Sequence, residues 1–305
     1  MFERLDYKYY GGLFIQPRKI FPGCKSIISA ALSYNFEWNN FDSKSAGYIA
    51  RYTTANFYRI LSKKLKKLGV VIKNKIAPSV SNKDFFRVFV NSKINDKLAA
   101  YVCGLGYYSK NSLIDVSGIG TKVVLGELLL AEELPASKPR VISCGDCNIC
   151  VEYCPTGALS NDGRVNKEIC IQHLSSELEW PDKINGKNFL DYWGVRFFGC
   201  TDCIDSCPEN NYVKKINNDK LSGFIGTSFN PEKIILFNKN DYKNYFRSNQ
   251  LGASWIPEAA LARNALASLY NLQKKSIIKS YLENISIYGW DEEERKYLTD
   301  FIKKL

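Results

Sequence analysis

Eight of the ten cysteines in this 305-residue chain lie in one stretch, between residues 144 and 207. The first residues, Met-Phe-Glu-Arg-Leu-Asp, are charged from the third position, and no apolar run approaches the roughly 20 residues of a membrane span. We therefore expect a cytoplasmic protein without a membrane partner. Thiols stay reduced in the cytoplasm, so disulfides are disfavoured and the cysteines predict thiolate ligands for metal.

The spacing of these cysteines indicates iron-sulfur clusters. Residues 144–155 read Cys-x2-Cys-x2-Cys-x3-Cys-Pro, which is typical of bacterial ferredoxins. Residues 200–208 hold only three cysteines before a proline, and Cys170 can supply the missing ligand. In two-cluster ferredoxins the last cysteine of a run binds the other cluster. We predict two 4Fe-4S clusters, one on Cys144, Cys147, Cys150 and Cys207 and one on Cys154, Cys170, Cys200 and Cys203.

Structural zinc is the alternative for this cysteine pattern, since two Cys-x2-Cys motifs also make tetrahedral zinc sites. Zinc sites need neither the third closely spaced cysteine nor the Cys-Pro endings, which favours iron-sulfur clusters. Cys24 and Cys103 lie outside the pattern, and we expect them to be small buried apolar residues rather than ligands.

Apolar periodicity predicts mixed helices and strands. Residues 26–34 and 86–90 are typical of strands, and residues 57–68 repeat apolar side chains at a helical period with lysines facing outward. Residues 259–269 carry an alanine and leucine stripe that predicts a helix, and Asp291 to Glu294 fit the capped start of the last helix.

These elements predict three domains. Two prolines bracket a linker at residues 135–139. We expect an α/β (α+β) domain at residues 1–135, a ferredoxin-like two-cluster module at 136–215 and a small α-helical domain at 216–305. The C-terminal helices have lengths that suit a HEAT-like helical repeat.

The chain resembles the epoxyqueuosine reductase family, which is dependent on cobalamin and related to reductive dehalogenases. The resemblance runs through Phe-Pro-Gly-Cys-Lys-Ser at 21–26, Ala-Arg-Tyr at 50–52, Gly-Leu-Gly-Tyr-Tyr-Ser-Lys-Asn at 104–111, Leu-Gly-Glu at 125–127, both cysteine motifs and Ala-Arg-Asn-Ala at 262–265. It implies that the N-terminal domain binds cobalamin, that the ferredoxin-like module feeds it electrons, and that the C-terminal helices help to hold tRNA.

One departure from the family affects the chemistry. The family's proton-donating aspartate ends a Val-Asp-Thr strand, and this chain has Val90-Asn91-Ser92 there. A carboxamide does not replace a carboxylic acid as a proton source at neutral pH. Tyr107, Tyr108 and Asp115 are the nearby candidates for that role.

The resemblance places five residues near the cofactor: Arg51, Asn91, Lys110, Asn111 and Gln172. Arg51 could meet a phosphate or amide oxygen, although a surface ion pair is nearly as good an interpretation. His173 is interpreted as a neutral hydrogen-bonding residue. Gly104-Leu-Gly106 lacks a third glycine and is expected to form a tight turn.

The main hypothesis is therefore a corrinoid-dependent reductase that converts epoxyqueuosine in tRNA to queuosine. It would be monomeric and would need an external low-potential electron donor. The net charge of +11 suits an RNA partner. The alternatives are a divergent reductase acting on another electrophile, a non-catalytic two-cluster electron-transfer protein, and an RNA-binding protein with purely structural clusters.

Overall fold

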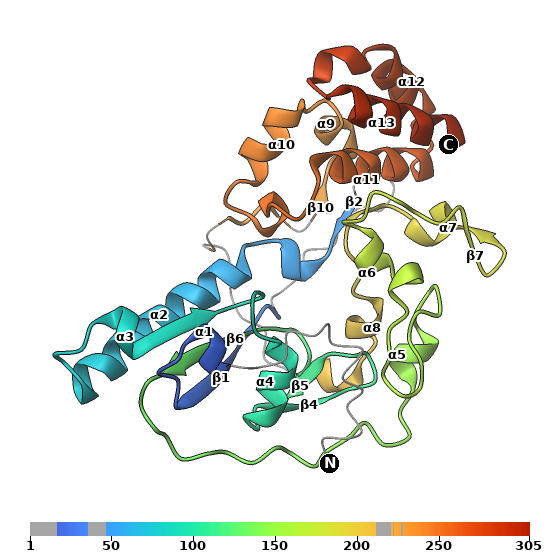
Figure 1. Ribbon diagram of the computed structural model, residues 1–305. Coiled ribbons are helices and arrows are strands. Elements are labelled where there is room, and N and C mark those ends of the chain that lie inside the picture. The colour runs from blue at the N-terminus through green and yellow to red at the C-terminus, as the bar shows by residue number, and fades with distance from the viewer. Residues whose placement is uncertain (1–16, 36–46, 212–220, 222, 227) are drawn as a thin grey trace. The chain divides into compact units, whose positions relative to one another are not determined.

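The computed structural model describes residues 17–35, 47–211, 221, 223–226 and 228–305 (Figure 1). The chain forms two compact units. The first combines described residues up to 35 with 57–147 and 208–211, and the second combines 47–56, 148–207 and the described residues from 221 on. The three-domain division remains a prediction. Within the described ranges, no helix is both long and apolar enough to cross a bilayer.

A three-stranded antiparallel sheet forms the centre of the first unit. Its strand order is β1 (Ser26–Ser33), β6 (Val123–Leu130) and β3 (Phe86–Phe89), so both predicted strands are confirmed. The middle strand β6 reads Val-Val-Leu-Gly-Glu-Leu-Leu-Leu, and all but its first residue are buried. Glu127 is the one ionisable residue in this strand, directly opposite Ser29 of β1 and Phe89 of β3.

Helices α2 (Phe57–Ile76) and α4 (Asp96–Val102) pack against this sheet (Figure 1). Helix α2 buries Phe57, Leu61 and Leu65 at four-residue spacing, as predicted, and it continues eight residues past the predicted end at residue 68. A Cβ on Gly126 would lie 3.1 Å from Leu61 Cδ2, so this glycine lets β6 approach α2 closely. Successive strand residues point to opposite faces, so Glu127 points away from α2.

The remaining elements of the first unit are short. Strands β4 (Gly106–Tyr108) and β5 (Ile114–Val116) form a hairpin. The turn that leads into β4 contains Gly104, whose positive φ of 72° is expected for a tight turn. These elements are α1 (Pro17–Ile20), α3 (Asn82–Phe85), β4 (Gly106–Tyr108), β5 (Ile114–Val116) and the 3-10 turn η4 (Pro208–Asn210).

Helix α11 (Glu258–Asn271) lies at the centre of the second unit. Every residue from Ala259 to Leu269 is buried, so the predicted apolar stripe is one face of a helix that is covered all round. Helix α11 contacts strand β9 (Arg196–Phe198) and five helices (Figure 1). These helices are α7 (Phe189–Trp193), α9 (Pro231–Ile234), α10 (Lys239–Phe246), α12 (Lys275–Glu283) and α13 (Glu292–Lys304). The assignment of the C-terminal helices to a HEAT-like repeat remains a prediction.

Helix α13 (Glu292–Lys304) begins with the predicted cap. The Asp291 carboxylate accepts from the Glu294 backbone N–H at 2.9 Å, and the Glu294 carboxylate accepts from the Asp291 backbone N–H at 3.2 Å. This reciprocal pair satisfies two N–H groups that the helix itself cannot bond.

A small sheet of order β10, β2, β9 and several short helices complete the second unit. The strands are β2 (Gly47–Ile49), β7 (Lys183–Ile184), β8 (Lys187–Asn188), β9 (Arg196–Phe198) and β10 (Ser228–Phe229). The α-helices are α5 (Ile149–Glu152), α6 (Ile171–Leu174), α7 (Phe189–Trp193), α8 (Asp202–Asp205), α9 (Pro231–Ile234), α10 (Lys239–Phe246) and α12 (Lys275–Glu283). The 3-10 turns are η2 (Arg51–Thr53), η3 (Lys167–Ile169), η5 (Gln250–Gly252) and η6 (Ile285–Tyr288).

Candidate iron-sulfur and cofactor site

Short helices carry the predicted cluster ligands of the second unit. Cys150 lies in α5, Cys203 lies in α8, and these two helices pack against each other. Cys170 is the residue at the start of α6, and Cys200 lies between β9 and α8. Helices α5, α6 and α8 have four residues each, so the chain changes direction after about one turn and several cysteines lie close together.

Five of these thiols act on one another electrostatically. Burial raises the pKa of Cys203, and the neighbouring thiols of Cys200, Cys170, Cys154 and Cys150 raise it further. Burial also raises the pKa of Cys200 to about 12 and raises that of Cys170, to which Cys154 contributes. Thiolates placed together and partly shielded from water need a cationic centre, and an iron-sulfur cluster supplies one. The donor set therefore fits cluster binding by these cysteines, and their division between two clusters remains a prediction.

Backbone N–H groups point at the predicted sulfur ligands. The Ala158 N–H donates to Cys154 Sγ at 3.2 Å. In the first unit, the Lys110 N–H donates to Cys144 Sγ at 3.4 Å. Such donors stabilise the thiolate form that binds iron and tune the potential of a cluster.

Buried polar residues of α11 hold the segment that follows Cys170. Arg263 is fully buried, and its guanidinium donates to the carbonyls of Leu174 at 3.3 Å and Leu178 at 3.1 Å. The neighbouring Asn264 donates to the Ser175 carbonyl at 2.9 Å. The guanidinium also stacks on Trp180, 3.8 Å from the ring centroid. Carbonyls at the end of α6 thus obtain partners that the short helix does not provide.

The same helix holds the segment that precedes Cys200. Ser268 donates to the Arg196 carbonyl at 2.6 Å, and Asn271 donates to the Leu190 and Gly194 carbonyls at 2.8 Å. Helix α11 thereby fixes the chain on the approach to two predicted ligands. This role of residues 262–265 was not predicted from the sequence. The signal for it was a polar Arg-Asn pair inside a helix of alanine and leucine.

Two candidate segments come together in the second unit. The Tyr52 hydroxyl, next to Arg51, donates to the Gln172 side-chain oxygen. A Cβ on Gly199 would collide with both side chains, and Gly199 has a positive φ of 77°. The structure therefore brings Arg51-Tyr52, Gln172 and the residue before Cys200 to one place.

The candidates of the first unit have different surroundings. Lys110 Nζ donates to the Gly145 carbonyl at 2.8 Å, so this lysine holds the loop that carries Cys144. Asn111 is buried, and its side-chain oxygen accepts from Ser109 Oγ at 2.5 Å and from the Leu113 N–H at 3.1 Å. Asn111 thus shapes the turn between β4 and β5. Asn91 is exposed, with a left-handed φ of 46°.

The other candidates lie as follows. Asp115 of β5 is buried opposite Tyr107, and burial, reinforced by Glu209, raises the pKa of its carboxyl to about 6. His173 Nε2 lies 3.7 Å from Glu177 Oε1. Cys24 is buried among apolar residues, as expected, while Cys103 is half-buried and its Sγ lies 3.6 Å from the Ile27 carbonyl oxygen.

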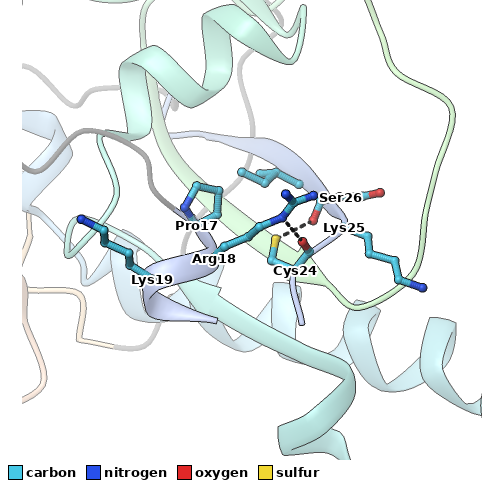
Figure 2. Close-up of a pocket in the computed structure, with 7 residues that line it drawn as sticks. Pro17, Arg18, Lys19, Cys24, Lys25 and Ser26 are labelled. Carbon is cyan, nitrogen blue, oxygen red and sulfur yellow. Dashed lines mark hydrogen bonds between the residues drawn. The ribbon is translucent and has the colours of Figure 1, made fainter. Parts of the chain in front are cut away.

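Figure 2 shows a hollow near the start of the first unit, lined by Arg18, Lys19, Lys25 and Cys24 among others. The Arg18 guanidinium bonds the Cys24 carbonyl at 3.3 Å. None of the predicted site residues lines this hollow, so it is separate from the candidate site.

Comparisons with known proteins agree with the cysteine pattern and with the first unit. Residues 143–210 match the 4Fe-4S double cluster binding domain, and residues 15–92 match the domain described as epoxyqueuosine reductase QueG, DUF1730. An epoxyqueuosine reductase of Salmonella typhimurium is 34% identical over 281 residues, which cover 90% of this chain and 71% of that protein. The chain belongs to the epoxyqueuosine reductase family.

Other members of the epoxyqueuosine reductase family give the same result. The Escherichia coli enzyme is 33% identical over 221 residues, 70% of this chain, but that match spans only 56% of the longer relative. The structure of the Streptococcus thermophilus enzyme has a TM-score of 0.77 at 23% identity, covering 95% of this chain and 75% of that one. A family structure with an epoxyqueuosine-modified tRNA-Tyr stem loop has a TM-score of 0.75 at 22% identity, covering 95% and 84%. These two likenesses establish the mixed α/β fold.

Proposed function

We propose that this chain is an iron-sulfur and cobalamin-dependent reductase that acts on epoxyqueuosine in tRNA. The observation that carries the proposal is the combination, in one chain, of a double cluster-binding domain with a group of neighbouring cysteine thiols and a family-matched N-terminal region. When bound, the clusters would supply electrons and the corrinoid would supply the reducing centre.

The chain's own residues have separable tasks in this proposal. Cys154, Cys170, Cys200 and Cys203 hold one cluster, and Cys144, Cys147, Cys150 and Cys207 hold the other. Arg51 and Gln172 contact the corrinoid, as do Lys110, Asn111 and Asn91. Helix α11 keeps Cys170 and Cys200 in place through Arg263 and Ser268. The HEAT-like C-terminal helices and the basic surface of the chain attract tRNA.

We further propose a cytoplasmic monomer served by an external low-potential electron donor. The second candidate function is a non-catalytic two-cluster electron-transfer protein. Asn91 favours it, because a carboxamide stands where the family has its acid.

Anaerobic purification with cobalamin supplied distinguishes the two functions. The reductase should contain about eight irons and one cobalt per chain, and its absorption spectrum should change in the corrinoid bands after a strong reductant. It should then convert epoxyqueuosine in a tRNA stem loop to queuosine, with an unmodified stem loop as the control substrate. Eight irons without cobalt would favour the electron carrier, and zinc in place of iron would refute both functions.

A further inference from the structure

Two carboxyl groups lie close together in the first unit, and one of them bonds the turn that holds Asn91. Glu127 is fully buried in β6, and both of its carboxyl oxygens are out of reach of water. Asp96 is the first residue of α4 and is half-buried; its Oδ1 atom is out of reach of water, and its carboxyl lies close enough to Glu127 to raise the pKa of that group. An isolated buried carboxylate is costly, and two adjacent ones cannot both ionise. The pair must therefore keep at least one proton.

Among the residues that the structure describes, none of the groups that shift these two pKa values is a cation. Burial, with the Asp96 carboxyl next in importance, raises the pKa of Glu127 to about 10; Ser29 of β1 lowers it. Burial also raises the pKa of Asp96. The Cys103 thiol, which follows α4, faces Glu127, and burial raises the pKa of that thiol. Helix α2 presents the apolar Leu61 and Leu65 to the other face of the sheet.

Asp96 connects the pair to the surface. Its Oδ2 atom accepts from the Asn91 backbone N–H at 2.8 Å, and Asn91 is exposed. The carboxyl of Asp96 thus bonds directly to residue 91. At this position a proton donor is expected, and this chain has a carboxamide. The Glu127 oxygens and Asp96 Oδ1 have no hydrogen-bond partner among the described residues, so a proton on Glu127 reaches Asp96 when these adjacent side chains rotate into contact.

We propose that Asp96 and Glu127 together hold one proton and deliver it, at the Asn91 turn, to the substrate oxygen released on reduction. This inference rests on the proposed function. Removing an epoxide oxygen as water takes two electrons and two protons. The electrons come from the external reductant. The Asp96 O–H bond breaks as an O–H bond forms on the released oxygen, Glu127 protonates Asp96 again, and solvent supplies the second proton and restores the pair.

The test of the pair itself needs neither cobalamin nor substrate. Infrared spectra of the purified iron-sulfur protein at pH 7 should show the C=O stretch of a buried protonated carboxyl in the wild type and in Asp84→Asn, an exposed acid of α3. Glu127→Gln should lose the band, because glutamine keeps the size of the side chain and a donor but holds no acidic proton. A wild-type spectrum without the band, or a band unchanged in E127Q, would overturn the inference.

Unfolding provides an independent readout of the same proton. Folded Glu127 has a pKa of about 10 against an ordinary 4.5, so its contribution to stability is complete below pH 4.5 and is lost as pH rises toward 10. The urea midpoint of the wild type should therefore fall between pH 6 and pH 9 more steeply than that of E127Q. Parallel midpoints in the two proteins would contradict a proton on Glu127.

Single-turnover reduction of the epoxyqueuosine stem loop tests the use of the proton. Asp96→Asn keeps an oxygen that can accept from the Asn91 N–H, so it separates proton supply from positioning of the turn. We expect D96N to slow reduction about 100-fold, as for loss of a general acid, while D84N matches the wild type. If D96N reduces the stem loop at the wild-type rate, the inference is overturned and the proposed function is not. A rate about 100-fold lower in Asp115→Asn, with no change in D96N, would have the same meaning. A wild type that binds cobalamin and does not reduce the stem loop would overturn the proposed function and this use of the proton; the infrared band would still decide whether the pair holds one.

Discussion

Cys203→Ala should lose one complete cluster and keep the other, leaving about four of eight irons per chain. Cys203 is half-buried, and the thiols of Cys200, Cys170, Cys154 and Cys150 act on it, so its loss removes one ligand from the middle of the group. Iron and sulfide counts after anaerobic purification measure the effect. Cys24→Ala is the matched control, because it makes the same change at a buried thiol in an apolar cluster of the first unit, and it should keep all the iron.

A second variant tests the crossed assignment of the ligands to the two clusters. Cys207→Ala should also lose half of the iron, but from the other cluster. The reduced C203A and C207A proteins should therefore give different electron paramagnetic resonance spectra, each with a single cluster signal. Identical spectra would refute the crossed assignment, and full iron in C203A would refute the ligand quartet.

Arg263→Met should destabilise the protein by about 3 kcal/mol or more, because the side-chain oxygen of the fully buried Asn264 would lose its donor and the carbonyls of Leu174 and Leu178 would lose a charge-assisted bond. Burial lowers the pKa of Arg263 to about 10, so the guanidinium is still charged at neutral pH and its loss removes several charge-assisted bonds. Methionine is apolar and of similar length, which limits the cavity.

Anaerobic urea unfolding of the iron-loaded protein measures this loss. Lys296→Met makes the same change of residue class at an exposed position of α13 and should shift the midpoint little. R263M should in addition lose iron faster to a chelator. Arg263 bonds the Leu174 and Leu178 carbonyls, and the segment that follows Cys170 would lose these bonds. A midpoint for R263M equal to that of K296M would show that the α11 network does not support the cysteine segment.

Local patterns were sufficient for several elements of both units. Strands β1 and β3 lie where their apolar runs predicted them, and the Asp291 cap starts α13 as expected. The end of α2 was placed too early, because the apolar period weakens after Leu68 although no proline occurs before Pro78. A helix continues through weak positions until its backbone is interrupted.

The candidate site was only partly accessible from the sequence. The cysteine spacing predicted the ligands, because a cluster imposes its own geometry on the loop that binds it. The Asp96–Glu127 pair was missed, although one carboxylate in an otherwise apolar strand was a visible signal. Asn111 was expected to bind cofactor, and its side chain is occupied in a turn within the described structure.

The sequence alone determined the cluster-binding cysteine pattern, several of the strands and helices, and the resemblance to epoxyqueuosine reductases, because each depends on spacing along the chain. Only the tertiary structure decided which buried polar groups meet. Asp96 reaches Glu127 because α4 packs on the sheet face toward which Glu127 points, and Arg263 reaches the end of α6 because α11 is buried at the centre of its unit. Contacts between residues distant in sequence arise from packing, which local patterns do not encode.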